Sequence, residues 1–340
     1  MRALLCRELG NINNLEFGEI AAPVLDPDRS DQVRIRVHAS GVNFPDILMV
    51  EGKYQVKPAL PFVPGLEVAG EVIECAPGVS HVHPGDRVIA FARHGGGHAE
   101  QIVVPGAIVT PLPDALDYAS AAAFPIAFGT AHFALTHRGQ LSAGQTLLVL
   151  GAAGGVGLAA IKVGKFLGAT VIATASSADK LKVASAAGAD YTINYQAEAL
   201  RDRVLALTDG KGCDLVFDPV GGTAFEQCVR CIGWEGRILI IGFASGDIPR
   251  VATNMILVKN FSVTGVVFGE HSARYPEESR ARFESLLDAV TSGALIIEPP
   301  AVFALSNGVA ALDEMANRRV IGKIVLTPDQ GKPTIVRSTQ

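Results

Sequence analysis

The sequence predicts an α/β fold, in which a doubly wound parallel sheet is joined to a second domain built mainly of β strands. From about Phe124, short apolar strands alternate with alanine-rich helical segments, as is typical of a parallel sheet covered by helices on both faces. Before Phe124, short strands are separated by Gly- and Pro-rich turns, which indicates a barrel-like β domain. The 340 residues exceed the roughly 100–200 of one ordinary domain, so two domains are expected.

The β-rich part is expected over residues 1–124 and 269–340. Its predicted strands alternate with period two or follow a Pro-Gly turn, and they are Val33–His38, Glu67–Ile73 and Arg87–Ala90. After residue 269, a charged helix over Pro276–Ser292 leads to a last strand at Gly322–Leu326. We expect that strand to return to the first domain.

The parallel sheet is expected over residues 125–268. Its predicted strands are short continuous apolar runs: Thr146–Leu150, Thr170–Ala173, Asp214–Phe217, Arg237–Ile241 and Phe261–Val266. Helices are expected between them, at Val156–Leu167, Ala178–Ala187 and Thr223–Ile232. The last of these helices places Cys228 and Cys231 one turn apart on one face, which favours packing over metal or redox chemistry.

Composition excludes several classes of protein. Apolar residues make up 49% and charged residues 19%, which is incompatible with a disordered chain. The net charge is −5 and charges of both signs are interspersed, so the sequence shows no basic patch that would indicate nucleic-acid binding. No apolar stretch reaches the roughly 18 residues of a spanning helix. The five scattered cysteines indicate reduced thiols, and we therefore expect a cytoplasmic protein without membrane contact.

The segment Gly151-Ala-Ala-Gly-Gly-Val-Gly157 follows a predicted strand and opens a predicted helix. Glycines allow a tight turn and let backbone N–H groups approach a pyrophosphate, which then lies at the positive end of the helix. Against the G-x-G-x-x-G pattern Ala152 replaces the first glycine, and a turn used only for packing is the alternative. The context predicts a Rossmann dinucleotide site at Ala153, Gly154, Gly155 and Val156.

The end of the next strand decides between NAD and NADPH. An acidic side chain there would bind the ribose 2′-OH of NAD, but this strand runs into Ala175-Ser176-Ser177. Ser176 and Ser177 can hydrogen-bond a 2′-phosphate, and Lys180 can supply the compensating charge. We predict NADPH, although Asp179 beside that lysine argues the other way unless it only complements the helix dipole.

Several longer motifs resemble those of the medium-chain dehydrogenase/reductase superfamily, and within it the zinc-free quinone oxidoreductase (zeta-crystallin-like) group. The resemblance covers essentially the whole chain. Its most specific pieces, besides the glycine turn, are Gly41–Asp46, Leu60–Gly70, Pro84–Val88 and Phe217–Gly222. It implies that the β-rich part is a GroES-like catalytic domain.

The same resemblance predicts that metal is absent. Where zinc-dependent alcohol dehydrogenases of the superfamily hold a catalytic zinc, this sequence has what look like Asn43, Leu66 and Ile126, which are poor or impossible ligands. The structural zinc loop appears here as Phe91–His98, without cysteine. His81, His83, His94 and His98 lie in loops marked by Gly or Pro, where solvated side chains are expected rather than a metal site.

By resemblance, Asn43 and Tyr54 face the nicotinamide and substrate, although Tyr54 could equally be an ordinary half-buried tyrosine. Asp46 is expected to fix its loop or the cofactor rather than to transfer protons. Arg318 resembles a cofactor-contacting arginine but could also be solvated surface. The remaining expected cofactor contacts are Thr130, Tyr195, Gly242, Phe243, Val266, Val267 and Phe268.

Without zinc to stabilise an alkoxide, alcohol oxidation is disfavoured, whereas quinones and conjugated carbonyls delocalise an incoming electron pair. The expected activity is therefore that of an NADPH:quinone oxidoreductase acting on a quinone or enone. Two alternatives stay open: an enoyl- or acryloyl-CoA thioester reductase, and a crystallin-like structural protein that binds NADPH. By family likeness we also expect a homodimer, and the strand at Phe261–Val267 is apolar enough to extend its sheet across a two-fold axis.

Overall fold

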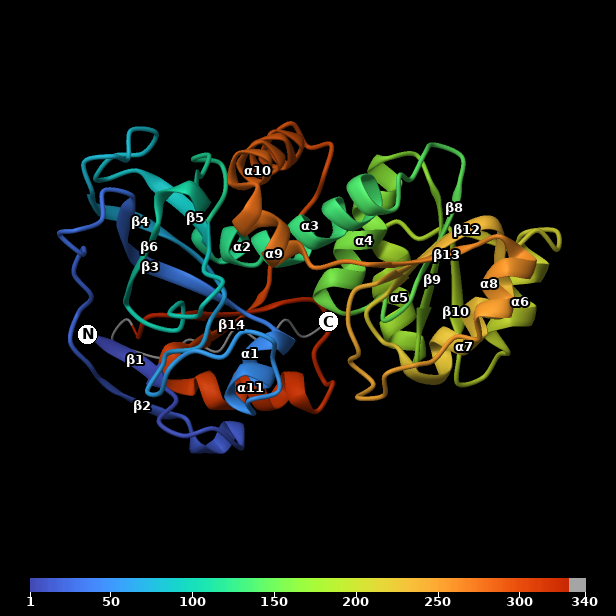
Figure 1. The fold of residues 1–340 in the computed structure, drawn as a ribbon, viewed down its shortest axis with the longest axis horizontal. Helices are drawn as coiled ribbons and strands as arrows, with labels where there is room; N and C mark the ends of the chain where they lie inside the picture. The colour runs from blue at the N-terminus through green and yellow to red at the C-terminus, as the bar shows by residue number, and fades with distance from the viewer. Residues whose placement is uncertain (330–340) are drawn as a thin grey trace. The chain divides into compact units, whose positions relative to one another are not determined.

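The computed structural model describes residues 1–329 (Figure 1). The chain divides into two compact units, unit 1 formed by Met1–Ile126 and the segment from Gly269 onward, and unit 2 formed by Ala127–Phe268. The division expected from the sequence differs from this one only at Pro125 and Ile126, which group with unit 1.

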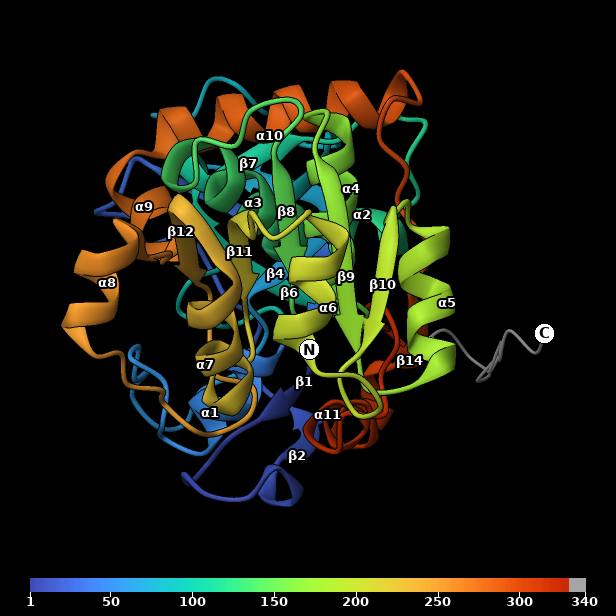
Figure 2. The same cartoon turned by 90° about the vertical axis from the view of Figure 1, so that its right-hand side faces the viewer.

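Unit 2 contains a six-stranded parallel sheet with the order β10-β9-β8-β11-β12-β13 (Figure 2). Its strands are β8 (Thr146–Val149), β9 (Thr170–Ala175), β10 (Tyr191–Asn194), β11 (Cys213–Asp218), β12 (Ile232–Ile240) and β13 (Ser262–Gly265). From β8 the chain adds β9 and β10 on one side of the sheet, and it then crosses back and adds β11, β12 and β13 on the other side. The crevice at this switch point, at the carboxyl ends of the strands, is where such sheets bind ligands.

The strands of unit 2 form because their side chains are buried on both faces. Leu148, Val171, Val216 and Ile238 are each fully buried. The elements that accompany the strands are α3 (Pro125–His132), the π-helical η3 (Phe133–Arg138), α4 (Gly155–Phe166), α5 (Ala178–Ala186), α6 (Leu200–Leu207), α7 (Gly222–Cys231) and α8 (Thr253–Lys259). The doubly wound Rossmann arrangement predicted from the sequence is confirmed.

The five cysteines are free thiols. Cys228 and Cys231 are fully buried on α7, within one apolar cluster that includes Val216 and Ile238. The prediction that they serve helix packing agrees with this position.

Unit 1 contains a mostly antiparallel seven-stranded sheet with the order β14-β15-β3-β4-β5-β7, to which β6 adds by pairing with β3. Its strands are β3 (Gln32–Val42), β4 (Glu67–Cys75), β5 (Arg87–Phe91), β6 (Gln101–Pro105), β7 (Val109–Pro111), β14 (Ala301–Ala304) and β15 (Ile324–Thr327), beside a two-stranded sheet of β1 (Arg2–Leu5) and β2 (Glu16–Glu19). Strand β15 pairs with β3, which confirms that the strand predicted at Gly322–Leu326 returns to the first domain.

The helical elements of unit 1 surround this sheet. They are α1 (Phe44–Val50), α2 (Tyr118–Ala122), α9 (Phe268–Arg274), α10 (Pro276–Thr291), α11 (Gly308–Ala316) and the 3₁₀ turns η1 (Ile12–Asn14), η2 (Gly106–Ile108) and η4 (Leu305–Asn307). Of these, α10 is the charged helix that the sequence predicts. The short helix α9 before it is missed, because seven residues carry too little periodicity.

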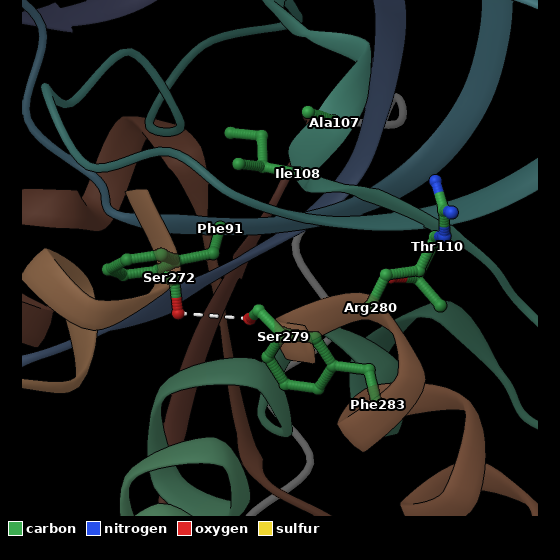
Figure 3. Close-up of a pocket in the computed structure, with 8 residues that line it drawn as sticks. All are labelled: Phe91, Ala107, Ile108, Thr110, Ser272, Ser279, Arg280 and Phe283. Atoms are coloured by element: carbon green, nitrogen blue, oxygen red, sulfur yellow. Dashed lines mark hydrogen bonds between the residues drawn. The ribbon is translucent and has the colours of Figure 1, made fainter. Parts of the chain in front are cut away.

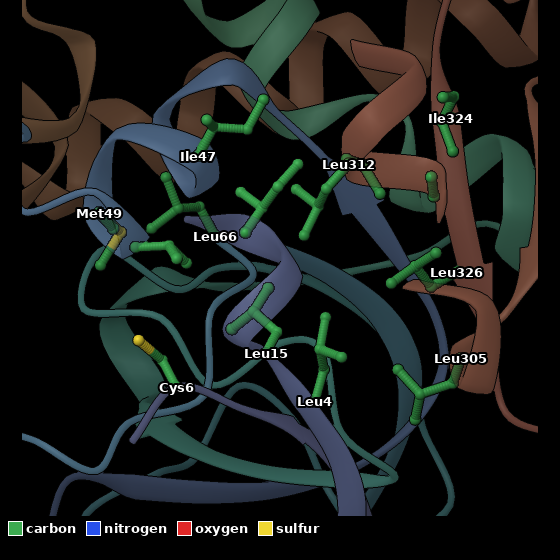
Figure 4. Packing of buried hydrophobic residues seen from close by; sticks show 14 of the residues in the cluster. Leu4, Cys6, Leu15, Ile47, Met49, Leu66, Leu305, Leu312, Ile324 and Leu326 are labelled. Atoms are coloured by element: carbon green, nitrogen blue, oxygen red, sulfur yellow. The ribbon is translucent and has the colours of Figure 1, made fainter. Parts of the chain in front are cut away.

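An apolar core lies beneath α1 (Figure 4). Ile47 of α1 packs in one buried cluster with Leu4, Leu66, Leu312 and Ile324. Ile47 of α1, Leu66 just before β4 and Ile324 of β15 all pack in this core. The polar residues adjacent to them in the sequence are therefore held in position as well.

Among the described residues, no helix is long and apolar enough to cross a membrane.

Candidate functional site

The glycine turn of unit 2 connects β8 to α4 as expected. Gly151 has φ +58°, which a residue without a side chain adopts at little cost. A Cβ at Gly157 would lie 2.3 Å from the Gly151 carbonyl oxygen, so the first turn of α4 approaches the strand closely only because residue 157 is glycine. A Cβ at Gly154 would meet nothing nearer than 3.5 Å. The backbone is thus approachable from solvent at Gly154.

The first residues of α4 offer N–H groups that have no intrahelical acceptor. Gly154 is the N-cap and supplies no side-chain hydrogen bond to them. Gly155 and Val156 are half-buried, and Ala153 is buried. A helix start of this kind, with the positive end of the dipole exposed, fits the phosphate groups of a dinucleotide.

The end of β9 carries hydroxyl groups and no carboxylate. Ser177 is the N-cap of α5, where its Oγ accepts a long hydrogen bond from the Lys180 backbone N–H at 3.4 Å. Ser176 is half-buried beside it. Asp179 is exposed in the first turn of α5 and lies 3.3 Å from the Lys182 ammonium. Asp179 therefore lies where its carboxylate complements the positive end of the α5 dipole. This was one of the two interpretations of Asp179 that the sequence left open.

Tyr195 directly follows β10 and is exposed, and its N–H donates to the carbonyl oxygen of Ala175 at the tip of β9. The adenosine-side position expected for Tyr195 is therefore next to Ser176 in the fold, although the two residues are separated in sequence.

The expected nicotinamide-side residues of unit 2 differ in exposure. Gly242 and Phe243 follow β12, and the backbone N–H of Gly242 donates to the Asp218 carbonyl oxygen at 3.4 Å. Val267 is 53% exposed between β13 and α9, whereas Val266 and Phe268 are buried. Phe268 is the first residue of α9 and is tilted against Phe133, with ring centroids 5.9 Å apart.

Thr130 is buried on α3. Since the side chains of Val266, Phe268 and Thr130 are largely packed, any contact to a cofactor from the two apolar residues would come from the backbone, as the resemblance implies.

Asp218, at the end of β11, is a feature the sequence analysis used only as part of a motif. It is fully buried, and its Oδ1 accepts hydrogen bonds of 2.8 Å from the N–H groups of Val220 and Gly221. Burial raises the pKa of this carboxyl, against the lowering effect of those two N–H donors. Its Oδ2 has no partner among the described residues. Asp218 thus shapes the turn that lies against Gly151, whose added Cβ would meet Val220 at 3.2 Å.

In unit 1, Asn43 begins α1 and is only 6% exposed. Its Nδ2 donates to Glu67 Oε1 at 2.8 Å and to the Gly41 carbonyl oxygen at 3.3 Å, and its Oδ1 accepts from the Lys323 ammonium at 2.8 Å. We call Val42, Asn43, Glu67 and Lys323 the Lys323 cluster. Sequence analysis missed Glu67 and Lys323 as members of the site.

Asp46 fixes the loop, which was one of its two expected roles. Its Oδ2 accepts from the Asn43 N–H at 2.7 Å and its Oδ1 from the Gly65 N–H at 3.1 Å. The side chain is fully buried. Those two hydrogen bonds tie the start of α1 to the loop that precedes β4.

Tyr54 is half-buried against the core of unit 1. Burial raises the pKa of its hydroxyl, assisted by the negative charge of Asp46 and opposed by Arg93. Since an ordinary tyrosine is already protonated at neutral pH, the Tyr54 hydroxyl can donate a hydrogen bond. Arg318 is exposed and has φ +57° just after α11.

One expectation about the histidines is wrong. His98 is fully buried and not solvated, and its Nδ1 lies 2.8 Å from the Ser40 hydroxyl, while its Nε2 lies 3.7 Å from Asp46 Oδ2. The glycines around it signal close packing and not an open loop, since a Cβ at Gly65 would lie 2.5 Å from the His98 backbone nitrogen. His83 and His94 are exposed as expected.

The three positions that resemble zinc-ligand positions, Asn43, Leu66 and Ile126, do not fit a zinc ion. Leu66 is 2% exposed in the apolar core, and Ile126 packs against that core. Neither side chain has an atom that can coordinate a metal. The amide of Asn43 is already engaged on both its nitrogen and its oxygen.

A pocket in unit 1 lies near α9 and α10 (Figure 3). It is lined mainly by apolar atoms around Phe91 and Phe283, and the hydroxyl groups of Ser272 and Ser279 are hydrogen-bonded at 2.9 Å in its wall. None of its lining residues is a predicted site residue. We therefore assign this pocket no part in the candidate site.

Comparison with known proteins agrees with both halves of the fold. Residues 29–114 match the alcohol dehydrogenase GroES-like domain, and residues 155–287 match the zinc-binding dehydrogenase family. A quinone oxidoreductase-like protein 2 homolog from Nematostella vectensis is 40% identical over 340 residues, covering 97% of this chain and 89% of the relative. The chain belongs to the medium-chain dehydrogenase/reductase family. The family and the fold class predicted from the sequence are thus confirmed.

Two further relatives of this medium-chain dehydrogenase/reductase carry related names. A quinone oxidoreductase from Pseudomonas aeruginosa is 36% identical over 298 residues, covering 87% of this chain and 91% of the relative. The structure of Escherichia coli quinone oxidoreductase complexed with NADPH is 27% identical, with a TM-score of 0.89, and covers 96% of this chain and 100% of that one. The similarity extends over both units.

Proposed function

We propose that this medium-chain dehydrogenase/reductase transfers hydride from NADPH to a quinone or a related conjugated carbonyl without a metal ion. The observation that carries the proposal is the tip of β9, where Ser176 and Ser177 precede α5 and the nearby carboxylate of Asp179 is exposed and paired with Lys182. Residues 175–177 at this tip include no carboxylate to bind a ribose 2′-OH, whereas hydroxyl and ammonium groups suit a 2′-phosphate.

The residues expected to hold NADPH follow from their places in the fold. The N–H groups at the start of α4, with Ala153, Gly154, Gly155 and Val156, suit the pyrophosphate, because Gly154 leaves the backbone open. Ser176, Ser177, Lys180 and Tyr195 gather around the tip of β9 on the adenosine side. When bound, NADPH supplies the hydride.

The other expected contacts are proposals from the family alone. They are Asn43, Asp46 and Arg318 in unit 1, and Thr130, Gly242, Phe243, Val266, Val267 and Phe268 in unit 2. The buried carboxylate of Asp46 is bound by two backbone N–H groups, so its contribution is to hold the loop that carries Asn43.

Reduction without metal is supported by the chemistry of unit 1. The zinc-ligand positions carry two aliphatic side chains, and the substrate oxygen must therefore be stabilised by hydrogen bonds. Tyr54 can provide one, because a phenol is protonated at neutral pH and burial raises the pKa of this one further. Quinones and enones need less stabilisation than a simple ketone, because their reduced forms delocalise the added electron pair.

The test is NADPH oxidation by the purified protein with ortho- and para-quinones, enones and enoyl-CoA thioesters. We expect turnover with quinones or enones and a clear preference for NADPH over NADH. Activity confined to the thioesters would assign the protein to the enoyl reductases. NADPH binding without any turnover would indicate the crystallin-like structural role instead.

We also propose a homodimer formed through β13, in a protein of the cytosol. Strand β13 is the last strand of the unit 2 sheet and so has an unpaired edge within the described structure. Nearby apolar side chains are strongly exposed: Trp234 by 69%, Leu257 by 79% and Val258 by 69%. Such an edge favours pairing with a second copy. Light scattering should give twice the chain mass, and a monomer at micromolar concentration would refute this arrangement.

A further inference from the structure

A buried ion pair stands next to Asn43. The Lys323 ammonium lies 2.5 Å from Glu67 Oε1, 2.8 Å from Asn43 Oδ1 and 3.2 Å from the Val42 carbonyl oxygen. The side chain of Lys323 is 11% exposed and that of Glu67 is fully buried. An ammonium has three N–H donors, and here each has an oxygen acceptor.

The sheet of unit 1 brings these residues together. Strand β3 runs antiparallel to both β4 and β15, so its end lies beside the beginnings of the other two. Asn43 follows β3, Glu67 opens β4, and Lys323 directly precedes β15. The pairing of Gly41 with Glu67 and of Val42 with Ile324 sets the register of the cluster.

The carboxylate of Glu67 is bound from three sides. Besides Lys323, it accepts hydrogen bonds from Asn43 Nδ2 at 2.8 Å and from the Ile126 N–H at 2.7 Å. Its place depends on Gly41, where an added Cβ would lie 2.2 Å from Glu67 Oε1. A buried carboxylate held this way needs a neighbouring cation, because an isolated buried charge is strongly unfavourable.

The pair also determines how the Asn43 amide is turned. A carboxylate only accepts hydrogen bonds, so Glu67 must face the Nδ2 group, and an ammonium only donates, so Lys323 must face Oδ1. Reversing the amide would break both contacts at once. Asn43 is thereby restricted to one orientation, at the position that by resemblance corresponds to a zinc ligand of the zinc-dependent dehydrogenases.

We propose that Lys323 is a positioning residue whose tethered ammonium fills a cation site made by oxygen atoms of Glu67, Asn43 and Val42. It holds Asn43 and the start of α1 in the geometry that reduction requires. The effect on turnover rests on the proposed function, whereas occupation of the cation site does not.

The site is tested with Lys323→Ala, which removes a group equal in size to propylammonium. We expect the melting temperature of this variant to fall by roughly 5 °C or more, and added propylammonium to restore part of the loss with a saturable dose response. Tetramethylammonium and sodium at equal ionic strength should not restore it. Absence of selective restoration by propylammonium would overturn the cation site.

The matched control is Lys165→Ala in unit 2. Lys165 pairs with Asp190 at 2.8 Å, but the two side chains are 36% and 35% exposed. Because solvent can replace the lost ammonium there, propylammonium should not change the melting temperature of this variant. A similar response in both variants would show a general amine effect and refute a specific site at Lys323.

Positioning is tested by hydrogen exchange of residues 41–50, which does not require turnover. Exchange of this segment should accelerate in Lys323→Ala and slow again with propylammonium, while the glycine turn at Gly151–Gly157 stays unchanged. Unaltered exchange over residues 41–50 would refute positioning, even if the protein reduces none of the proposed substrates.

A neutral double variant separates positioning from stability. In Glu67→Gln with Lys323→Met no buried charge is left, so the melting temperature should recover toward that of the wild type. Because no ammonium faces Asn43 Oδ1, kcat should remain roughly 10- to 100-fold lower, with NADPH affinity retained. Recovery of kcat together with stability would mean that the pair has a structural role only, which would overturn the proposal.

Discussion

The two regions that carry the proposed function are built in opposite ways. The glycine turn of unit 2 consists of seven consecutive residues, Gly151–Gly157, and offers backbone groups at a helix start. The Lys323 cluster of unit 1 joins side chains separated by 24 positions between Asn43 and Glu67 and by 256 between Glu67 and Lys323. A site made of backbone groups needs only consecutive residues that allow a tight turn. The side-chain network needs the ends of three strands, β3, β4 and β15, to lie side by side.

This difference has an energetic counterpart. The glycine turn tolerates loss of a ligand, because it contains no charged side chain and has open space beside Gly154. The Lys323 cluster buries opposite charges, so the loss of one partner leaves the other without compensation. Mutations should therefore affect mainly ligand binding in the first region and mainly stability and geometry in the second.

Removal of Glu67 should have the largest effect. Glu67→Ala removes the only carboxylate paired with Lys323 among its described contacts and the acceptor of the Ile126 N–H, and we expect a loss of about 3–5 kcal/mol of unfolding free energy. Urea denaturation measures it. Glu71→Ala is the control on the same strand, because Glu71 pairs with Arg36 at 3.0 Å on the surface, and it should cost no more than about 1 kcal/mol. Equal losses of unfolding free energy in Glu67→Ala and Glu71→Ala would contradict the claim that the buried pair matters more for stability than the surface pair.

Two glycines of the turn should respond differently to the same change. Gly157→Ala forces a Cβ against the Gly151 carbonyl oxygen and Ala152, at 2.3 and 2.8 Å, and should cost about 2–3 kcal/mol. Gly154→Ala has open space and should fold normally, yet weaken NADPH binding by at least about tenfold if phosphates approach there. Denaturation and NADPH fluorescence titration separate the two effects. Normal NADPH affinity in Gly154→Ala would argue against the proposed phosphate position.

The tip of β9 should determine cofactor choice. Lys180→Ala removes a cation from the proposed 2′-phosphate site, and we expect kcat/KM with NADPH to fall roughly tenfold while the value with NADH changes little. Lys165→Ala, at the far end of α4, removes a partly exposed lysine paired with Asp190 and should leave the preference intact. A parallel fall with both cofactors in Lys180→Ala would place the lysine outside the 2′-phosphate site.

The smallest effect is expected at Asp218, and it depends on pH. Burial raises the pKa of its carboxyl in the folded protein, so the folded state holds the proton more tightly than the unfolded state. This contribution to stability is fully present below the unfolded pKa and is lost as pH rises through the folded pKa. Asp218→Asn keeps the acceptor for Val220 and Gly221 and should flatten the decline. The measurement is the melting temperature of each variant as a function of pH, with Asp179→Asn as an exposed control. If the melting temperature of Asp218→Asn falls with rising pH as steeply as that of the wild type, the pH dependence comes from another group.

Much of the fold was predictable because its signals are local. Continuous apolar strands alternating with helices predicted the parallel sheet, and the glycine turn was found at the junction of β8 and α4 because its residues are consecutive. The helix α9 was missed because it is short, and His98 was misjudged because a glycine-rich segment can be densely packed as well as exposed.

The sequence by itself determined the family, the doubly wound sheet and the position of the glycine turn, since each depends on residue patterns within short consecutive segments. Only the tertiary structure decided that Asp179 points to Lys182, that Tyr195 lies beside the tip of β9, and that Glu67 and Lys323 enclose Asn43. The physical reason is that the register between strands follows from packing and hydrogen bonding between distant segments. No local sequence pattern indicates which strand ends will lie next to one another in the folded protein.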